Sequence, residues 1–122
     1  MNSNEITGIE PGAFSGLTDV TEIYLHANQI ASLDAGLFTG LTSLQTLSLE
    51  NNLLTALPAT IFNGLSSLAN LYLGMNQITT LDAGLFTGLS NLGDLAIGAN
   101  KITTLAAGTF TGLSSLFSLQ LW

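Results

Sequence analysis

The feature that most constrains this chain is an asparagine that returns every 24 residues. It stands at positions 4, 28, 52, 76 and 100 of the 122-residue sequence. Repetition at a fixed period of about 20 to 50 residues is typical of proteins in which each unit stacks on the next and shares one continuous core. We therefore expect a solenoid rather than a domain folded around a central core.

The periods can be written in register along the whole chain. Four full periods run from residue 20 to residue 115, the opening piece fits the back half of a period, and the closing piece, LFSLQLW, fits the front half. We therefore predict a single domain over residues 1–122. It consists of a partial repeat 1–19, repeats 20–43, 44–67, 68–91 and 92–115, and a partial repeat 116–122.

Apolar residues recur at fixed positions of each period, counted from Val20 as position one. Aliphatic residues fill positions one, four and six, as in Leu68, Leu71 and Leu73. The spacing of two is typical of a strand with one buried face, so each period is predicted to form one short strand. Position nineteen is always Phe, and this column holds five of the six Phe in the chain. The column predicts a stacked aromatic spine inside the far wall of the coil.

The Asn and Gly columns have separate explanations. A coil that turns sharply after its strand leaves backbone N–H and C=O groups without strand partners, and an inward Asn amide can donate to and accept from them. We expect the five Asn to form a ladder. Nine of the thirteen Gly fall in two further columns, which predicts turns with positive φ or close backbone contacts. The Gly columns are positions 12, 36, 84 and 108, and positions 16, 40, 64, 88 and 112.

Together these columns match the leucine-rich repeat pattern LxxLxLxxNxL followed by IxxLxxGxFxGL. Over practically its whole length the chain resembles the 24-residue form typical of extracellular members of that family. The resemblance implies an α/β fold class, a right-handed leucine-rich repeat solenoid with a parallel β-sheet on the concave face and turns or short 3-10 segments on the convex face. It also implies an extracellular or cell-surface location. Extracellular members usually close both ends with Cys-rich caps, whereas this chain contains no Cys.

In this family ligands usually dock on the concave face, which implies a protein-interaction module that binds a protein or glycan partner. An alternative is a structural or self-assembling repeat segment that uses its uncapped ends, because the edge of an uncapped coil is apolar. Outward strand residues vary from coil to coil, as in a scaffold that displays different side chains from a fixed frame. Tyr24 and Tyr72 are the best anchor candidates. The candidate partner-binding residues are Glu22, Tyr24, His26, Thr46, Ser48, Glu50, Asn70, Tyr72, Met75, Asp94 and Gln120.

Charge and hydropathy exclude several other partners. Eight acidic residues face one base, Lys101, and the formal net charge is −7. No cationic surface is therefore available to neutralise phosphates, so we expect no nucleic-acid partner and a weak general preference for basic partners. No stretch approaches the roughly 18 uninterrupted apolar residues of a membrane span, so no membrane insertion is expected.

Residues suited to catalysis or metal binding are scarce. The chain has one His and no Cys, and it lacks the GxSxG, GxxxxGK[ST] and HExxH motifs, so we predict neither an enzyme nor a cofactor. Glu10 and Asp34 stand at equivalent positions and could share Ca²⁺. Two carboxylates fall short of the about six to eight oxygens that this ion takes, so we interpret Asp34 as a local cap and predict no metal site. His26 could titrate near neutral pH beside Glu50, although a solvated His is the simpler interpretation.

Overall fold

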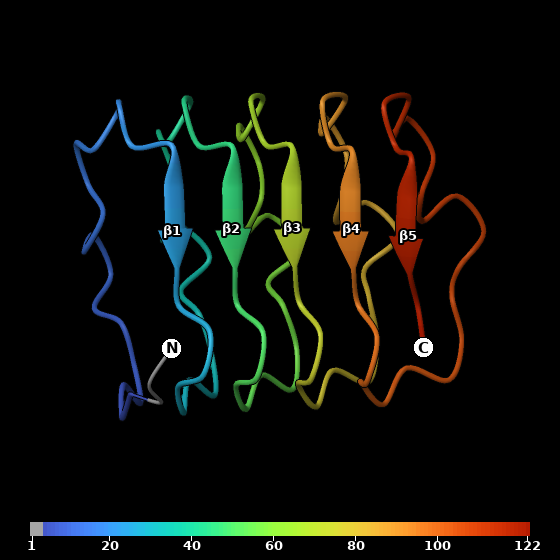
Figure 1. Cartoon of the computed structure of the whole chain (residues 1–122), viewed down its shortest axis with the longest axis horizontal. Coiled ribbons are helices and arrows are strands. Elements are labelled where there is room, and N and C mark those ends of the chain that lie inside the picture. The colour runs from blue at the N-terminus through green and yellow to red at the C-terminus, as the bar shows by residue number, and fades with distance from the viewer. Residues whose placement is uncertain (1–3) are drawn as a thin grey trace.

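The computed structural model describes residues 4–122, and in it each period contributes one strand of three residues. Neighbouring strands pair in parallel, with each residue opposite the one 24 positions further on, in the order β1-β2-β3-β4-β5 (Figure 1). The 24-residue repeat is thereby confirmed as the structural unit. The strands are β1 (Glu22–Tyr24), β2 (Thr46–Ser48), β3 (Asn70–Tyr72), β4 (Asp94–Ala96) and β5 (Ser118–Gln120).

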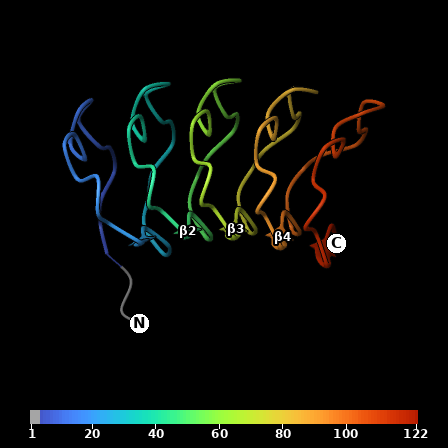
Figure 2. The ribbon, with the colours of Figure 1, turned by 90° about the horizontal axis from the view of Figure 1, so that it is seen from above.

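The coils form a curved stack with the sheet on its inner side. Figure 2 shows the coils fanning out away from the strands, so the strands lie closer together than the opposite loops. That opposite, convex side consists of turns, and residues 4–122 contain no helix. The predicted solenoid with a concave parallel sheet is confirmed, with turns rather than 3-10 segments on its convex face. The described part of the chain accordingly has no helix that could cross a bilayer.

The aliphatic columns fill the space between the sheet and the turns. The middle residue of each interior strand is fully buried, as at Leu47, Leu71 and Leu95, each 0% exposed. Burying one such side chain contributes about 1.5–3 kcal/mol relative to leaving it in water. The core is therefore continuous from coil to coil, as expected for stacked repeats.

The Phe column forms the predicted aromatic spine, with stacked rings in three of its four neighbouring pairs. The rings of Phe62 and Phe86 stack with their centroids 6.3 Å apart and an interplanar angle of 9°. Phe86 stacks on Phe110 at 6.1 Å, and Phe14 stacks on Phe38 at 6.0 Å. The spine lies on the turn side of the core, where each stacked pair joins the return segments of two successive coils.

The Asn side chains satisfy backbone groups where each coil turns away from the sheet. The amide nitrogen of Asn52 donates to the carbonyls of Leu49 at 3.0 Å and Glu50 at 3.2 Å in its own coil. It also donates to the Leu25 carbonyl of the preceding coil at 3.0 Å, and its Oδ1 accepts the N–H of Ile30 at 3.1 Å. One side chain thus ties two coils together through four hydrogen bonds.

The same set of four bonds recurs along the stack. Asn76 and Asn100 each repeat it one and two coils further on, and the Leu49 carbonyl accepts from both Asn52 and Asn76. Asn4 is instead exposed, so the expectation of an inward amide fails for the first member of the column.

The second Gly column is explained by its backbone conformation. All five of its members have φ between +81° and +86°, a region that side chains disfavour. This half of the Gly prediction is confirmed at Gly16, Gly40, Gly64, Gly88 and Gly112.

The first Gly column contains two different turns. Gly12 and Gly108 have φ of +82° and +83°, as predicted. Gly36 does not have positive φ; its N–H donates to Asp34 Oδ1 at 2.9 Å, and the N–H of Gly84 donates to an Asp Oδ1 in the same way at 2.8 Å. An Asp two residues earlier therefore caps the turn and selects its conformation.

A further left-handed residue follows each of the strands β1 to β4, at position eight of the period. Its members have φ between 54° and 58° although none is Gly. Only Gly and, less often, Asn or Asp adopt this region readily. The chain therefore makes a fixed, sharp turn directly beside the sheet at Ala27, Asn51, Met75 and Ala99.

Candidate functional site

The outward residues of the sheet form one continuous surface on the concave side, here called the concave surface. In each strand the middle residue points into the core, whereas its two neighbours point out, because side chains alternate along a strand. The strand register places equal positions about 4.8 Å apart. One row contains Glu22, Thr46, Asn70, Asp94 and Ser118, and the other contains Tyr24, Ser48, Tyr72, Ala96 and Gln120.

The candidate residues differ in their exposure on this surface. Tyr24 is 51% exposed and Met75 is 58% exposed. Glu22 and Gln120 are also exposed. Six candidates are half-buried: His26, Thr46, Glu50, Asn70, Tyr72 and Asp94. We therefore expect the exposed group to provide most of any contact with a partner.

Ser48 departs from the prediction. It lies on the outward side of β2 but is only 4% exposed. In the strand register it stands between Tyr24 and Tyr72, whose larger side chains flank it. Ala96, at 7% exposure, occupies the same row beyond Tyr72. Small and large residues alternate along this row, so Ser48 belongs to the floor of the surface rather than to its contact area.

Tyr72 is held by a neighbour on the next strand. Its hydroxyl donates to Asp94 Oδ2 at 3.2 Å. Burial raises the pKa of the Tyr72 phenol, and the negative charge of Asp94 and this hydrogen bond raise the pKa further. The other carboxylate oxygen of Asp94 is buried and has no hydrogen-bond partner within residues 4–122. Tyr72 is therefore a fixed part of the surface.

Two further side-chain contacts organise the surface. The rings of Tyr24 and His26 meet edge to face with their centroids 6.0 Å apart. The Asn70 amide donates to Thr46 Oγ1 at 3.1 Å across β2 and β3. The structure therefore places His26 beside an aromatic ring of its own coil, a contact that the sequence interpretation did not include.

A shallow hollow of about 150 Å³ lies at the end of the concave surface where the chain leaves β3 and β4. Its floor includes Gly74 and Gly98, and Glu50 and Trp122 are among the residues around it. A Cβ atom added at Gly74 would stand 3.4 Å from Glu50 Oε1, so the carboxylate lies above bare backbone. Since Trp122 is 83% exposed, its indole is open to solvent beside the hollow. The hollow thus combines the bare backbone of Gly74 with the Glu50 carboxylate and the Trp122 side chain beside it.

Residues suited to metal binding are not brought together. No group of three or more His, Asp or Glu side chains in residues 4–122 could hold a metal ion. Asp34, one member of the pair considered for Ca²⁺, caps its own turn through the N–H of Gly36. The interpretation of Asp34 as a local cap is confirmed.

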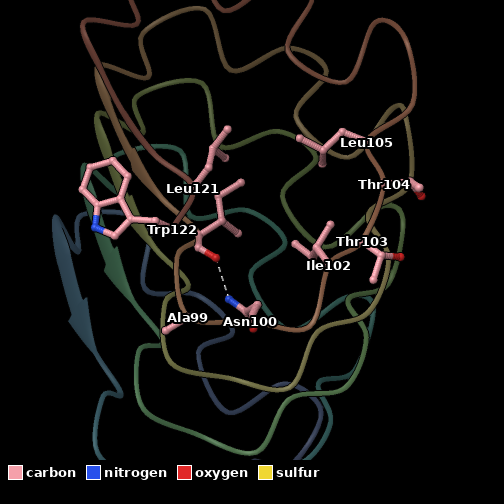
Figure 3. Close-up of a pocket in the computed structure, with 9 residues that line it drawn as sticks. Ala99, Asn100, Ile102, Thr103, Thr104, Leu105, Leu121 and Trp122 are labelled. Atoms are coloured by element: carbon pink, nitrogen blue, oxygen red, sulfur yellow. Dashed lines mark hydrogen bonds between the residues drawn. The ribbon is translucent and has the colours of Figure 1, made fainter.

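A larger hollow of about 350 Å³ opens at the interior of the coil that follows β4. Figure 3 shows Ile102 and Leu105 on one side, facing Leu121 across the space, whereas the indole of Trp122 extends away from them. These are core columns that are less covered than elsewhere: Leu105 is 40% exposed, whereas the equivalent Leu33 is 8% exposed. The hollow is thus a face of the apolar core, distinct from the concave surface.

Two elements of the surface were missed by the sequence interpretation. The hollow at Gly74 and Gly98 was signalled by Gly at position seven in two successive periods, beside Glu50 in the period before and Trp122 in the one after. Phe117 is 83% exposed, and its ring covers the Cα of Gly93. Its signal was that it is the one Phe outside the aromatic column.

Comparison with known proteins agrees with this geometry. The family model described as leucine rich repeat matches residues 1–54, 19–78, 42–95 and 66–121. The matches overlap and together span almost the whole chain. The chain therefore belongs to the leucine-rich repeat family. No curated protein that was compared with the chain matches it.

Solved structures of the Toll–Spatzle complex of Drosophila contain similar chains. In the glycosylated form of the complex, a chain with 30% sequence identity superposes with a TM-score of 0.93 over 98% of the present chain. In a second structure of the complex the identity is 29%, the TM-score is 0.75 and the coverage is again 98%. The present chain spans 16% and 19% of those chains.

Proposed function

We propose that this chain is a protein-interaction module that binds a protein partner on its concave surface, by recognition rather than catalysis. The observation that carries the proposal is the exposure of two large side chains, Tyr24 in β1 at 51% and Met75 just beyond the end of β3 at 58%. An aromatic side chain such as that of Tyr gives a large contact area at low cost in conformational entropy, and the flexible thioether of Met can adapt to the shape of a partner. A fixed backbone that displays them suits recognition.

The similar structures support this proposal. The chains that superpose on the present chain belong to a complex of two proteins, Toll and Spatzle. Five strands about 4.8 Å apart give a surface smaller than the roughly 800 Å² per partner of a standard stable interface. We therefore expect this chain by itself to bind weakly, with a dissociation constant in the micromolar range or above.

The experiment is covalent capture from a defined position. A photo-cross-linking amino acid replaces Tyr24, and in a matched variant it replaces Leu17, an apolar residue of similar exposure (48%) on another part of the molecule. Both variants are irradiated in protein extract from the organism that carries the chain. We expect one protein to cross-link from position 24 and not from position 17, and to be lost when Met75 is replaced by Ala. Equal labelling from both positions, or none from position 24, contradicts the proposal.

A second candidate function is self-association through the less covered face of the core. The observation that favours it is the apolar hollow between Leu105 and Leu121, which are 40% and 47% exposed. Burying such surface against a second copy would be favourable at about 25 cal/mol per Å². The average mass in solution should then rise with concentration, and Leu121→Glu should abolish the rise. A concentration-independent monomer mass contradicts this candidate.

We also propose an extracellular or cell-surface location for the protein. Support comes from the 24-residue repeat form and from the glycosylated state of the similar Drosophila complex. Antibody labelling of intact, unpermeabilised cells should detect the chain. Labelling only after permeabilisation contradicts this location.

A further inference from the structure

We infer that the hollow over Gly74 and Gly98 is a subsite for an arginine side chain presented by a basic segment of the protein partner. This inference rests on the proposed function, because it names the chemical group that the concave surface would recognise. It depends on the shape of the hollow, on the two side chains beside it and on the charge of the surrounding surface.

The shape of the hollow follows from position seven of the repeat. This position carries Glu50 in the second coil, Gly in the next two and Trp122 in the last. The hollow has a volume of about 150 Å³, several times the roughly 30 Å³ that one water occupies in the liquid. Its open floor is Gly74, because a Cβ atom at Gly98 would overlap the Trp122 carbonyl oxygen, so backbone already fills that position. Both floor carbonyls have partners: the Gly74 carbonyl accepts from the Asn51 N–H at 3.0 Å, and the Gly98 carbonyl accepts from the Met75 N–H at 3.0 Å. An occupant therefore does not have to donate a hydrogen bond to these carbonyls.

The two sides of the hollow match the two properties of a guanidinium group. The carboxylate of Glu50 lies over Gly74 and can accept two parallel N–H bonds. The exposed indole of Trp122 offers a face on which a planar cation can stack. Lysine would satisfy the charge but not the flat face, so the site favours arginine.

The charge of the surrounding surface has the same sign. Glu22, Glu50 and Asp94 all belong to the concave surface, and Lys101 is the only Lys or Arg in the sequence. No arginine and at most one lysine of the chain itself can neutralise Glu50. A basic partner segment is therefore attracted to the surface as a whole and oriented by the hollow.

The test uses a minimal probe, a Gly-Arg-Gly peptide blocked at both ends, added to the whole 122-residue chain. Binding is followed by NMR through the backbone amide signals of Gly74 and Gly98. A matched peptide with citrulline in place of arginine keeps the shape and removes the charge. We expect saturable shifts of both Gly signals with the arginine peptide. The affinity of the citrulline peptide, obtained from the same signals, should be at least about fivefold weaker.

Three variants test the individual parts of the subsite. Glu50→Gln should weaken binding about fivefold, and Trp122→Ala should weaken it about threefold. Gly74→Ala should also weaken binding, because the added Cβ occupies the floor and stands only 3.2 Å from the Gly98 carbonyl. The control is Asp19→Asn, which removes the same charge as Glu50→Gln from an exposed position outside the hollow and should change affinity less than about twofold.

Several results would overturn the inference. They are equal shifts with both peptides, equal weakening by Glu50→Gln and Asp19→Asn, and no saturable shift of Gly74 or Gly98. The proposed function fails separately. A partner captured from position 24 that still binds Glu50→Gln and Gly74→Ala would leave the proposed function intact and remove the subsite. Saturable binding of the arginine peptide without any captured partner would leave the arginine subsite intact and contradict the proposed function.

Discussion

The interior and the concave surface of this molecule follow opposite rules. Inside, each column repeats one residue type, and its partner is the same column one coil away, as in the stack of Phe62 on Phe86. On the concave surface, equal positions carry different residues, such as Tyr24, Ser48 and Tyr72 along one row. The fold is therefore specified by identity between coils, whereas the proposed recognition would be specified by difference between them.

The largest effect is expected when the loss of a Phe in the aromatic column is compared with the loss of Phe117, the one Phe outside it. Phe86→Ala should lower the free energy of unfolding by about 3–5 kcal/mol, because the ring is 1% exposed and stacks on both neighbours. Phe117→Ala, the same substitution at 83% exposure, should change it by less than about 0.5 kcal/mol. Urea denaturation followed by circular dichroism measures both. Similar losses in the two variants would break the distinction.

The next largest effect is expected when a buried Asn of the column, Asn76, and its exposed member, Asn4, are each replaced by Ala. Asn76→Ala should cost about 2–3 kcal/mol, mainly because the buried N–H of Leu54 loses its partner. The Leu49 carbonyl keeps Asn52 as a donor, which limits the loss. Asn4→Ala should be nearly neutral, because Asn4 is exposed. Denaturation of the two variants decides; an equally large loss at Asn4 would show that the column acts through something other than burial.

A smaller effect sharpens the comparison within one Gly column. Gly108→Ala should cost about 1 kcal/mol, because its φ is +83°. Gly36→Ala should be neutral or stabilise by up to about 1 kcal/mol, because its φ is not positive and a Cβ there meets no atom closer than 3.5 Å. Thermal unfolding of both variants gives the difference. Equal destabilisation would mean that Asp34 does not select the turn.

The smallest effect concerns the hydrogen bond between Tyr72 and Asp94 on the concave surface. The pKa of Tyr72 is raised above its ordinary 10.0 by burial and then by Asp94, so the folded state favours the neutral phenol. This stabilisation is present below pH 10 and is lost as the pH rises through the raised folded value. Asp94→Asn should lower the pKa of Tyr72, as measured by NMR titration of its ring. An unchanged pKa would contradict the contact with Asp94.

Much of the fold could be predicted from the sequence, because each interior group contacts the equivalent group 24 residues away. The strand positions, the Phe spine and the interior Asn side chains all follow from that spacing. The candidate site was less predictable, because its details depend on unlike neighbours. Ser48 on the concave surface is covered because Tyr residues flank it. The same holds for the turns on the convex side, where Gly36 differs from Gly108 in conformation because an Asp stands two residues before Gly36 only. A period describes what is the same in every coil, so it does not show such local effects.

The carbonyl that Asn52 and Asn76 share has a consequence for how such a chain can change in length. Each amide bonds its own coil and the one before it, so a duplicated segment of 24 residues would bring both the donor and the acceptors that its new neighbours require. The deletion of a single residue would instead shorten one coil and break the 24-residue register between that coil and its neighbour. Evolution can therefore lengthen or shorten the array in whole units while each concave row diversifies on its own.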